Sequence, residues 1–160
     1  MSASAVDRLE FRGARLGYAR VSDGSLIVLR VAVVDVRVRG ETSPFGVEFD
    51  VTVTVGTSVY PSEEAQREAD GKQIAEPSKV PGEGWVPVGI AEKSPAYEEV
   101  VYRDEKVGRY LVRVEVEPIM ASKNTLYRVP PGVPWYLVRW VPKVTWSKIV
   151  DEGAARRGGG

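Results

Sequence analysis

Cysteine and histidine are both absent from this chain of 160 residues. Without cysteine there is no disulfide and no thiolate nucleophile, and without either residue there is no zinc site of the Cys/His type. The imidazole that most often acts as a general base near neutral pH is missing as well. Any metal would need oxygen ligands. The composition therefore favours a binding protein over an enzyme, and we expect neither a cofactor nor a bound metal.

Long apolar runs are also missing. The longest, residues 26–29 and 31–34, are separated by Arg30 and fall far short of the roughly 20 residues that span a bilayer. The N-terminus shows no basic stretch followed by an apolar one, so no secretory signal is expected. We expect a chain without a transmembrane helix that resides in the cytoplasm.

Side-chain amides are scarce, since Asn124, Gln66 and Gln73 are the only ones beside 28 valines. Few thermolabile residues, a proline-rich loop and many charges are typical of proteins from thermophiles, so we expect a thermophilic source. An apolar fraction of 43% in a chain of this length fits one globular domain. We place that domain at residues 1–152, followed by a flexible tail at 153–160.

Alternation of apolar and polar residues predicts strands along most of the chain. It is strictest at residues 47–55, where five apolar side chains share one face and Glu48, Asp50, Thr52 and Thr54 share the other. In residues 26–39 the alternation changes phase between Val33 and Val34, which indicates a β-bulge or a crossing between layers. A hairpin closed by residues 40–46 would pair Arg39 with Glu48, Arg37 with Asp50 and Val36 with Val51.

Other local signals complete the predicted fold. Residues 9–21 read as two short strands with a bend at Gly13, residues 22–25 as a turn, and residues 97–117 as a second hairpin that turns at 104–108. Residues 61–72 hold the one helical candidate, capped by Ser62, with only Ala65 and Ala69 to bury. Residues 71–96 are rich in Pro and Gly and predict a long loop with at most a short strand near Trp85.

These elements predict an all-β, mainly antiparallel fold. Seven or more short strands with turns between them favour a closed or partly open β-barrel, and a two-sheet sandwich is the alternative. At most one short peripheral helix is expected.

Charge balances overall but is distributed unevenly. Residues 41–117 contain eight basic and sixteen acidic residues, whereas residues 118–150, the basic aromatic segment, contain five basic residues and no acidic one. Single-stranded nucleic acid is held by cations that neutralise phosphates and by aromatic faces that stack on bases. We therefore predict a non-catalytic binding module that contacts single-stranded nucleic acid or a nucleoprotein assembly. Its nucleic-acid or partner surface would be made of Lys123, Tyr127, Arg128, Trp135, Tyr136, Arg139, Trp140, Lys143, Trp146 and Lys148.

Other interpretations stay open. Alternation at residues 135–141 puts some of the rings in the core, and the cations can pair with the acidic middle of the chain, for example Arg139 with Glu115 or Glu117. The chain would then be a protein-binding subunit of a homo-oligomer or a heteromeric complex. Trp85 either anchors the Pro/Gly loop to the domain or presents a ring to a partner.

An enzyme is the third possibility. If Glu48 and Asp50 shared a barrel interior with Glu115 and Glu117, these carboxylates could hold a divalent metal for phosphate-ester hydrolysis. The chain carries no Walker loop, no G-x-S-x-G, no H-E-x-x-H and no EF-hand loop, so no sequence motif supports catalysis.

Overall fold

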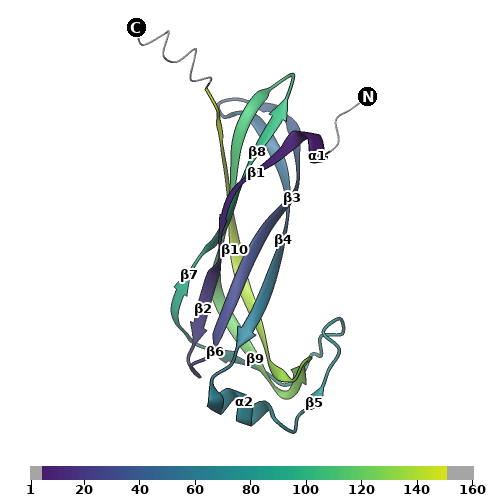
Figure 1. Cartoon of the computed structure of the whole chain (residues 1–160), viewed down its shortest axis with the longest axis vertical. Coiled ribbons are helices and arrows are strands. Elements are labelled where there is room, and N and C mark those ends of the chain that lie inside the picture. Colours follow the sequence, from purple (N-terminus) through teal and green to yellow (C-terminus); the bar gives the residue numbers. More distant parts are fainter. Residues whose placement is uncertain (1–4, 151–160) are drawn as a thin grey trace.

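The computed structural model describes residues 5–150 of the chain and shows two mainly antiparallel β-sheets packed face to face in a long, narrow molecule (Figure 1). The all-β class is confirmed. The described strands do not close into a barrel, and the two-sheet sandwich is the arrangement that forms. A single helical turn, α1 (Ala5–Arg8), precedes the first strand, and the flexible tail predicted at 153–160 lies outside the described residues.

The first sheet, sheet A, has the strand order β1, β8, β9, β10. These strands are β1 (Leu9–Arg15), β8 (Ala96–Asp104), β9 (Gly108–Val129) and β10 (Val133–Lys148). The last third of β9 also pairs with two short strands, β5 (Gln73–Ile74) and β6 (Trp85–Val88). Strand β10 therefore forms one outer edge of sheet A.

The second sheet, sheet B, has the order β4, β3, β2, β7. Its strands are β4 (Gly46–Tyr60), β3 (Leu26–Thr42), β2 (Gly17–Val21) and β7 (Ile90–Ser94). Strands β6 and β7 both fall in the segment predicted to be mostly loop. Short strands bounded by Pro and Gly carry little alternation, and β7 has only one side chain facing the core, Ile90. Strand β4 forms an outer edge of sheet B.

The chain passes from one sheet to the other at two neighbouring points. Strand β1 belongs to sheet A and β2 to sheet B, and the change occurs at Leu16 rather than at the predicted bend, Gly13, which instead marks a bulge in β1. Strands β7 and β8 make the reverse change at Pro95. A Cβ atom on Gly17 would lie 2.4 Å from the Ala96 nitrogen, so only glycine fits where the crossings meet.

The β3–β4 hairpin follows the predicted register over most of its length. Arg37 faces Asp50, Val36 faces Val51, and a bulge between Val33 and Asp35 confirms the change of phase seen in the sequence. The predicted pairing of Arg39 with Glu48 is wrong, because a second bulge near Gly40 shifts the last residues by one. Arg39 instead forms an ion pair with Asp50 on the outer face.

A buried carboxylate completes the first of these bulges. Beyond Leu29 strand β3 has no partner on the β2 side, and the Val33 amide there donates 2.9 Å to Glu98 Oε1 from sheet A. The Val36 amide donates to Asp35 in the same turn of the bulge. Glu98 is 7% exposed, and a buried backbone donor without a partner costs free energy, so this contact holds the two sheets in register.

The remaining predicted elements are confirmed. Strands β8 and β9 form the second hairpin and turn at Asp104–Gly108, and residues 22–25 form a turn with Gly24 at positive φ. Helix α2 (Glu63–Ala69) begins at the cap Ser62, whose hydroxyl accepts from the Ala65 amide, and it buries Ala65 and Ala69. Helix α2 covers the end of the sandwich opposite the β3–β4 turn (Figure 1).

The core consists of three apolar clusters stacked along the sandwich. Leu29 and Val31 from sheet B meet Val114 and Val116 from sheet A in the middle. The cluster near the β3–β4 turn contains Val36, Phe49, Val100, Tyr102 and Val112, and the one near α2 contains Val21, Ile27, Ala121 and Tyr136. Each fully buried large side chain contributes about 1.5–3 kcal/mol, so these clusters dominate stability. Within residues 5–150 no helix is long and apolar enough to span a membrane.

Candidate functional site

The basic aromatic segment forms most of the β9–β10 hairpin, and its cations differ sharply in their surroundings. Lys123 is buried and lies between two carboxylates, 3.0 Å from Asp23 and 3.1 Å from Glu68. Arg128 lies 3.8 Å from Asp70 and donates 2.9 Å to the Lys72 carbonyl. These two cations are neutralised within the chain.

Lys143 and Arg139 lie on the outer face of β10. Lys143 Nζ is 3.7 Å from Glu117, which also pairs with Lys93, so the predicted pairing of the cations with the acidic middle occurs here rather than at Arg139. Among residues 5–150 no carboxylate lies within ion-pair distance of Arg139 or Lys148. Arg139 instead approaches the Met120 sulfur at 3.8 Å.

The aromatic rings of the segment mostly face inward. Trp135 and Tyr136 are 5% and 7% exposed, and Trp140 packs on the middle core cluster. Trp146 packs edge to face on Phe49, and its Nε1 donates 3.0 Å to the Val47 carbonyl of β4. Tyr127 is partly exposed, with its hydroxyl 3.4 Å from Glu83. The rings thus stabilise the sandwich more than they present stacking surfaces.

Trp85 of β6 packs against Trp135 of β10 on the outer face of sheet A. Its ring packs edge to face on Trp135 with centroids 5.2 Å apart, and its Nε1 donates 2.8 Å to the Pro81 carbonyl. Asn124, which is buried, donates to the Glu83 carbonyl and accepts from two amides of its own strand. Together these contacts fasten the Pro/Gly segment to β9.

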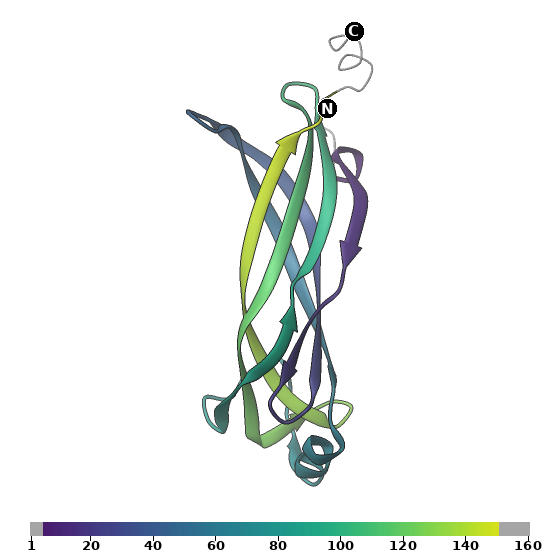
Figure 2. The same ribbon diagram turned by 90° about the vertical axis from the view of Figure 1, so that its left-hand side faces the viewer.

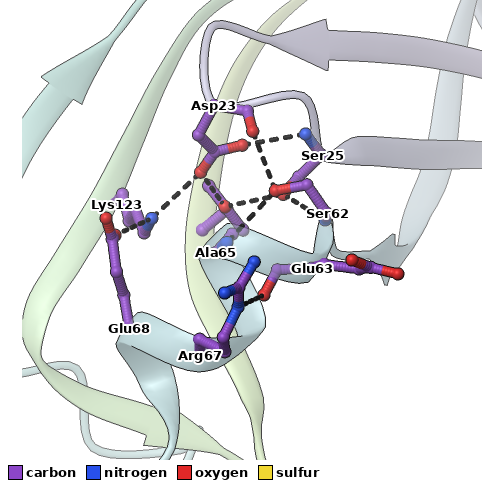
Figure 3. A network of polar contacts seen from close by, with 9 residues as sticks. Asp23, Ser25, Ser62, Glu63, Ala65, Arg67, Glu68 and Lys123 are labelled. Atoms are coloured by element: carbon purple, nitrogen blue, oxygen red, sulfur yellow. Dashed lines mark hydrogen bonds and ion pairs between the residues drawn. The ribbon is translucent and has the colours of Figure 1, made fainter.

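Lys123 belongs to a polar cluster between α2, the β2–β3 turn and the β9–β10 hairpin (Figure 3). The Asp23 carboxylate accepts from Lys123, from the Tyr136 hydroxyl and from the Ser25 amide. Ser62 donates 2.8 Å to the Asp23 carbonyl, and its amide donates 3.0 Å to Ser25 Oγ. The cluster therefore ties four segments that are distant in sequence at one end of the sandwich.

The pKa shifts in this cluster stabilise the charged form of Lys123 and the neutral form of Tyr136. Burial and the hydrogen bond to Asp23 raise the pKa of Tyr136 to about 12. Burial lowers the pKa of Lys123, but its bonds to Asp23 and Glu68 outweigh that effect and raise it. Burial acts to raise the pKa of Asp23, but its hydrogen bonds to Tyr136, Ser25 and Lys123 outweigh burial and lower the pKa below its usual value. At neutral pH Tyr136 keeps its proton and Lys123 its charge, so neither is a general base for a serine hydroxyl.

The carboxylates considered for metal binding are not brought together. Glu48 and Asp50 lie on the outer face of sheet B, with Asp50 paired to Arg39, whereas Glu117 lies on the outer face of sheet A. Glu115 shares that face of β9 with Glu117. Within the part of the chain that the structure describes, no group of three or more such side chains could hold a metal ion.

The surface formed by the described residues includes two hollows relevant to binding. A groove of about 510 Å³ crosses β6, β9 and β10 on the outer face of sheet A, and it is lined by Trp85, Pro87, Met120, Ala121, Ser122, Leu137, Val138 and Arg139. A cleft of about 550 Å³ lies under the turn of the β3–β4 hairpin and includes Glu41, Phe45, Glu48 and Lys148. Figure 2 shows that this end of the hairpin leans away from β8, β9 and β10. Phe45, in the turn, is 82% exposed.

The outer strands of the two sheets, β4 and β10, each have one edge that is not paired with another described strand. Among residues 5–150, β4, which has 15 residues, pairs only with β3, and β10, which has 16 residues, pairs only with β9. Sequence reasoning missed these edges, because alternation shows which residues face inward but not which strand lacks a neighbour. The length of both strands and the absence of Lys and Pro from β4 were signals that could have pointed to them.

Comparison of the chain with protein-family models, with curated proteins and with solved structures found no match.

Proposed function

We propose that this chain is a non-catalytic, protein-binding subunit that joins a homo-oligomeric or heteromeric assembly through its sheet edges. The observation that supports this function best is the pair of long outer strands, β4 and β10, which have no partner on their outer sides among the described strands. An open edge presents a row of backbone donors and acceptors that another chain can extend as a further strand.

Edge strands of monomeric proteins are usually protected by lysines, prolines, bulges or short length. Strand β4 has 15 residues with neither lysine nor proline, and its two register shifts arise from extra residues in β3. Strand β10 carries two prolines, Pro134 and Pro142, and two lysines, Lys143 and Lys148, so it is partly protected, but it is 16 residues long. Strand β4 in particular is an edge that an isolated monomer would have to protect.

The polar chemistry of the chain also favours binding over catalysis. Within residues 5–150 every buried side-chain nitrogen and oxygen has a hydrogen-bond partner. Lys123, Tyr136 and Asp23, the most deeply placed ionisable cluster, are occupied with one another. Such saturated groups hold a fold together and are not themselves free to act on a substrate.

The test compares the wild-type chain with an edge variant, Thr52→Lys/Thr54→Lys, in which two exposed side chains of β4 become the lysines that natural edges use. The control, Ala14→Lys/Leu16→Lys, adds the same charge beside β1 at the far edge of sheet A. Sedimentation of each pure chain and purification of each from its source cells would be compared. We expect the wild-type chain to associate with itself or with a partner. The lysines in β4 should abolish this association, whereas the lysines beside β1 should leave it unchanged. A wild-type monomer whose co-purifying proteins are identical for both variants would contradict the proposal.

Contact with single-stranded nucleic acid is a second candidate, and one place favours it. The groove on sheet A combines the Trp85 ring with Arg139, a cation that has no ion pair among the described residues. One stacked base contributes about 1–3 kcal/mol, so the groove would bind weakly. Titration with a labelled oligonucleotide at several salt concentrations tests it. Binding that weakens linearly on a log-log scale with salt and is lost in Arg139→Ala supports it, and no binding at low salt excludes it.

A further inference from the structure

The two unpaired edges lie on the same side of the molecule. Trp146 of β10 donates its indole hydrogen to the Val47 carbonyl of β4, which joins the outer strand of sheet A to the outer strand of sheet B. No backbone hydrogen bonds between β4 and β10 close this side of the sandwich. Both edges therefore face solvent together, one in each layer.

The two strands run in opposite directions. Strand β4 starts at the turn of the β3–β4 hairpin and ends beside α2. Strand β10 starts beside α2, where Gln66 donates 2.9 Å to the Gly132 carbonyl, and ends at Lys148, which lines the cleft under that same hairpin turn. A β4 strand and a β10 strand placed side by side at equal height would thus be antiparallel.

Core-facing side chains along this side remain incompletely covered. Val51, Val53 and Val55 of β4 pack on the middle core cluster but are only partly buried. Val144 of β10 lies opposite the fully buried Val114 and is nevertheless 37% exposed. Apolar surface at the margin of a core is what a neighbouring sheet would cover.

The outer faces of the two strands carry opposite charges, and within one chain Asp50 already pairs with Arg39 of β3 and Lys143 with Glu117 of β9. On β4 the polar face holds Glu48 and Asp50 and no cation, whereas on β10 the outer face holds Arg139 and Lys143 and no acid. Two β4 strands placed edge to edge would oppose like charges, and so would two β10 strands. Pairing β4 with β10 brings opposite charges together, and like charges directly opposite each other destabilise a sheet.

We infer that the occupant of these edges is a second copy of this chain, related by a two-fold axis parallel to the strands. This rests on the proposed function and selects one partner for it. Such an axis exchanges the positions of the two layers. Strand β4 of each copy then lies beside β10 of the other copy and runs antiparallel to it. Sheet B of one copy is thereby extended by sheet A of the other. A two-fold interface of this kind is closed and self-complementary.

The register follows from the contacts within one copy. A two-fold axis along the strands leaves heights unchanged, so residues of β4 and β10 that are level in one chain are opposite one another across the interface. The indole of Trp146 reaches the Val47 carbonyl, and we take these two residues as level to set the register. Counting three and seven residues along each strand sets Asp50 opposite Lys143 and Thr54 opposite Arg139 of the second copy.

Cysteine cross-linking tests this arrangement cleanly, because the chain has no cysteine of its own. Thr52 and Val141 are exposed residues that the register sets opposite each other in different copies. Antiparallel neighbours have Cα atoms about 4.5–5.5 Å apart, within the range that a disulfide can bridge. We expect an equal mixture of Thr52→Cys and Val141→Cys chains, oxidised mildly, to give the mixed disulfide as its main product.

The controls separate the possible outcomes. Neither variant alone should cross-link, and Ala14→Cys mixed with Val141→Cys should not cross-link, because β1 lies at the far edge of sheet A. Self-linking of Thr52→Cys would show β4 against β4 and overturn the inference, as would a chain that stays monomeric at every concentration. If the pure chain stays monomeric but co-purifies with another protein through β4, this inference fails and the proposed function survives.

Discussion

Tyr136 donates its hydroxyl hydrogen to the Asp23 carboxylate, which also accepts 3.0 Å from Lys123, so a strand of sheet A and a turn of sheet B share one partly buried anion. Lys123 and Tyr136, the two members of this cluster that titrate at alkaline pH, are stabilised in their protonated forms. The contacts at the α2 end of the sandwich therefore require the protonated forms of Tyr136 and Lys123, which high pH removes.

Alkaline pH should weaken this contact in a measurable way. Because the folded pKa of Tyr136 is raised to about 12 from 10.0, its contribution is complete below pH 10 and disappears as the pH rises through the folded value. Two pK units correspond to about 2–3 kcal/mol. We expect the excess stability of the wild type over Tyr136→Phe, measured by urea unfolding, to shrink by about that amount between pH 9 and pH 12. A pH-independent difference would contradict the assignment.

Removal of the buried cation should cost more than removal of an exposed one. In Lys123→Met the Asp23 and Glu68 carboxylates lose their shared partner at a site where the Lys123 side chain is only 8% exposed. We expect a loss of roughly 3 kcal/mol, the lower end for a broken buried ion pair. Lys143→Met, which breaks an exposed pair with Glu117, should change stability by at most about 1 kcal/mol. Equal losses in denaturant melts would show that the polar cluster has no structural role.

The close approach at the sheet crossing predicts a severe effect of one methyl group. In Gly17→Ala the new Cβ would meet the backbone of residues 94–96 at 2.4–2.7 Å, so the crossing must move. We expect a loss of about 3 kcal/mol, the upper end for overpacking. Gly56→Ala is the matched control, because its Cβ would meet nothing within 4 Å. The control should be neutral or slightly stabilising in thermal unfolding, and a tolerant Gly17 would disprove the crossing geometry.

The bulge in β3 supplies a further comparison. Glu98→Ala leaves the Val33 amide without its acceptor in the interior, which should cost about 1–3 kcal/mol. Glu99→Ala, one residue along β8, removes a surface contact to Arg113 and should cost at most about 1 kcal/mol. Hydrogen exchange at Val33 should accelerate in the first variant only. Unchanged protection there would mean that Glu98 is not the acceptor.

Local patterns predicted much of this fold because each depends on residues close in sequence. The alternation of residues 47–55, the phase change at Val33 and the Ser62 cap are all settled by neighbours within a few positions. The bulge near Gly40 escaped prediction because it leaves no mark in the alternation.

The features that decide function depend on distant pairs. Lys123 meets Asp23 and Glu68, which lie 100 and 55 residues away, so its charge could not be known to be neutralised. Whether β4 and β10 close a barrel or leave two edges open is likewise a tertiary outcome, because both arrangements give the same alternation along each strand. The basic aromatic segment therefore looked like a surface although most of its rings lie inside.

Reversal of one charge pair tests whether β4 of one copy lies beside β10 of the other. Asp50 and Lys143 are opposite each other only across the proposed two-fold interface, which contains this contact twice. Asp50→Lys and Lys143→Glu should each raise the dissociation constant of self-association at least about tenfold in sedimentation equilibrium, and the double variant Asp50→Lys/Lys143→Glu should restore it. A double variant as weak as its parents, or single variants that associate like the wild type, would contradict edge-to-edge pairing of β4 with β10.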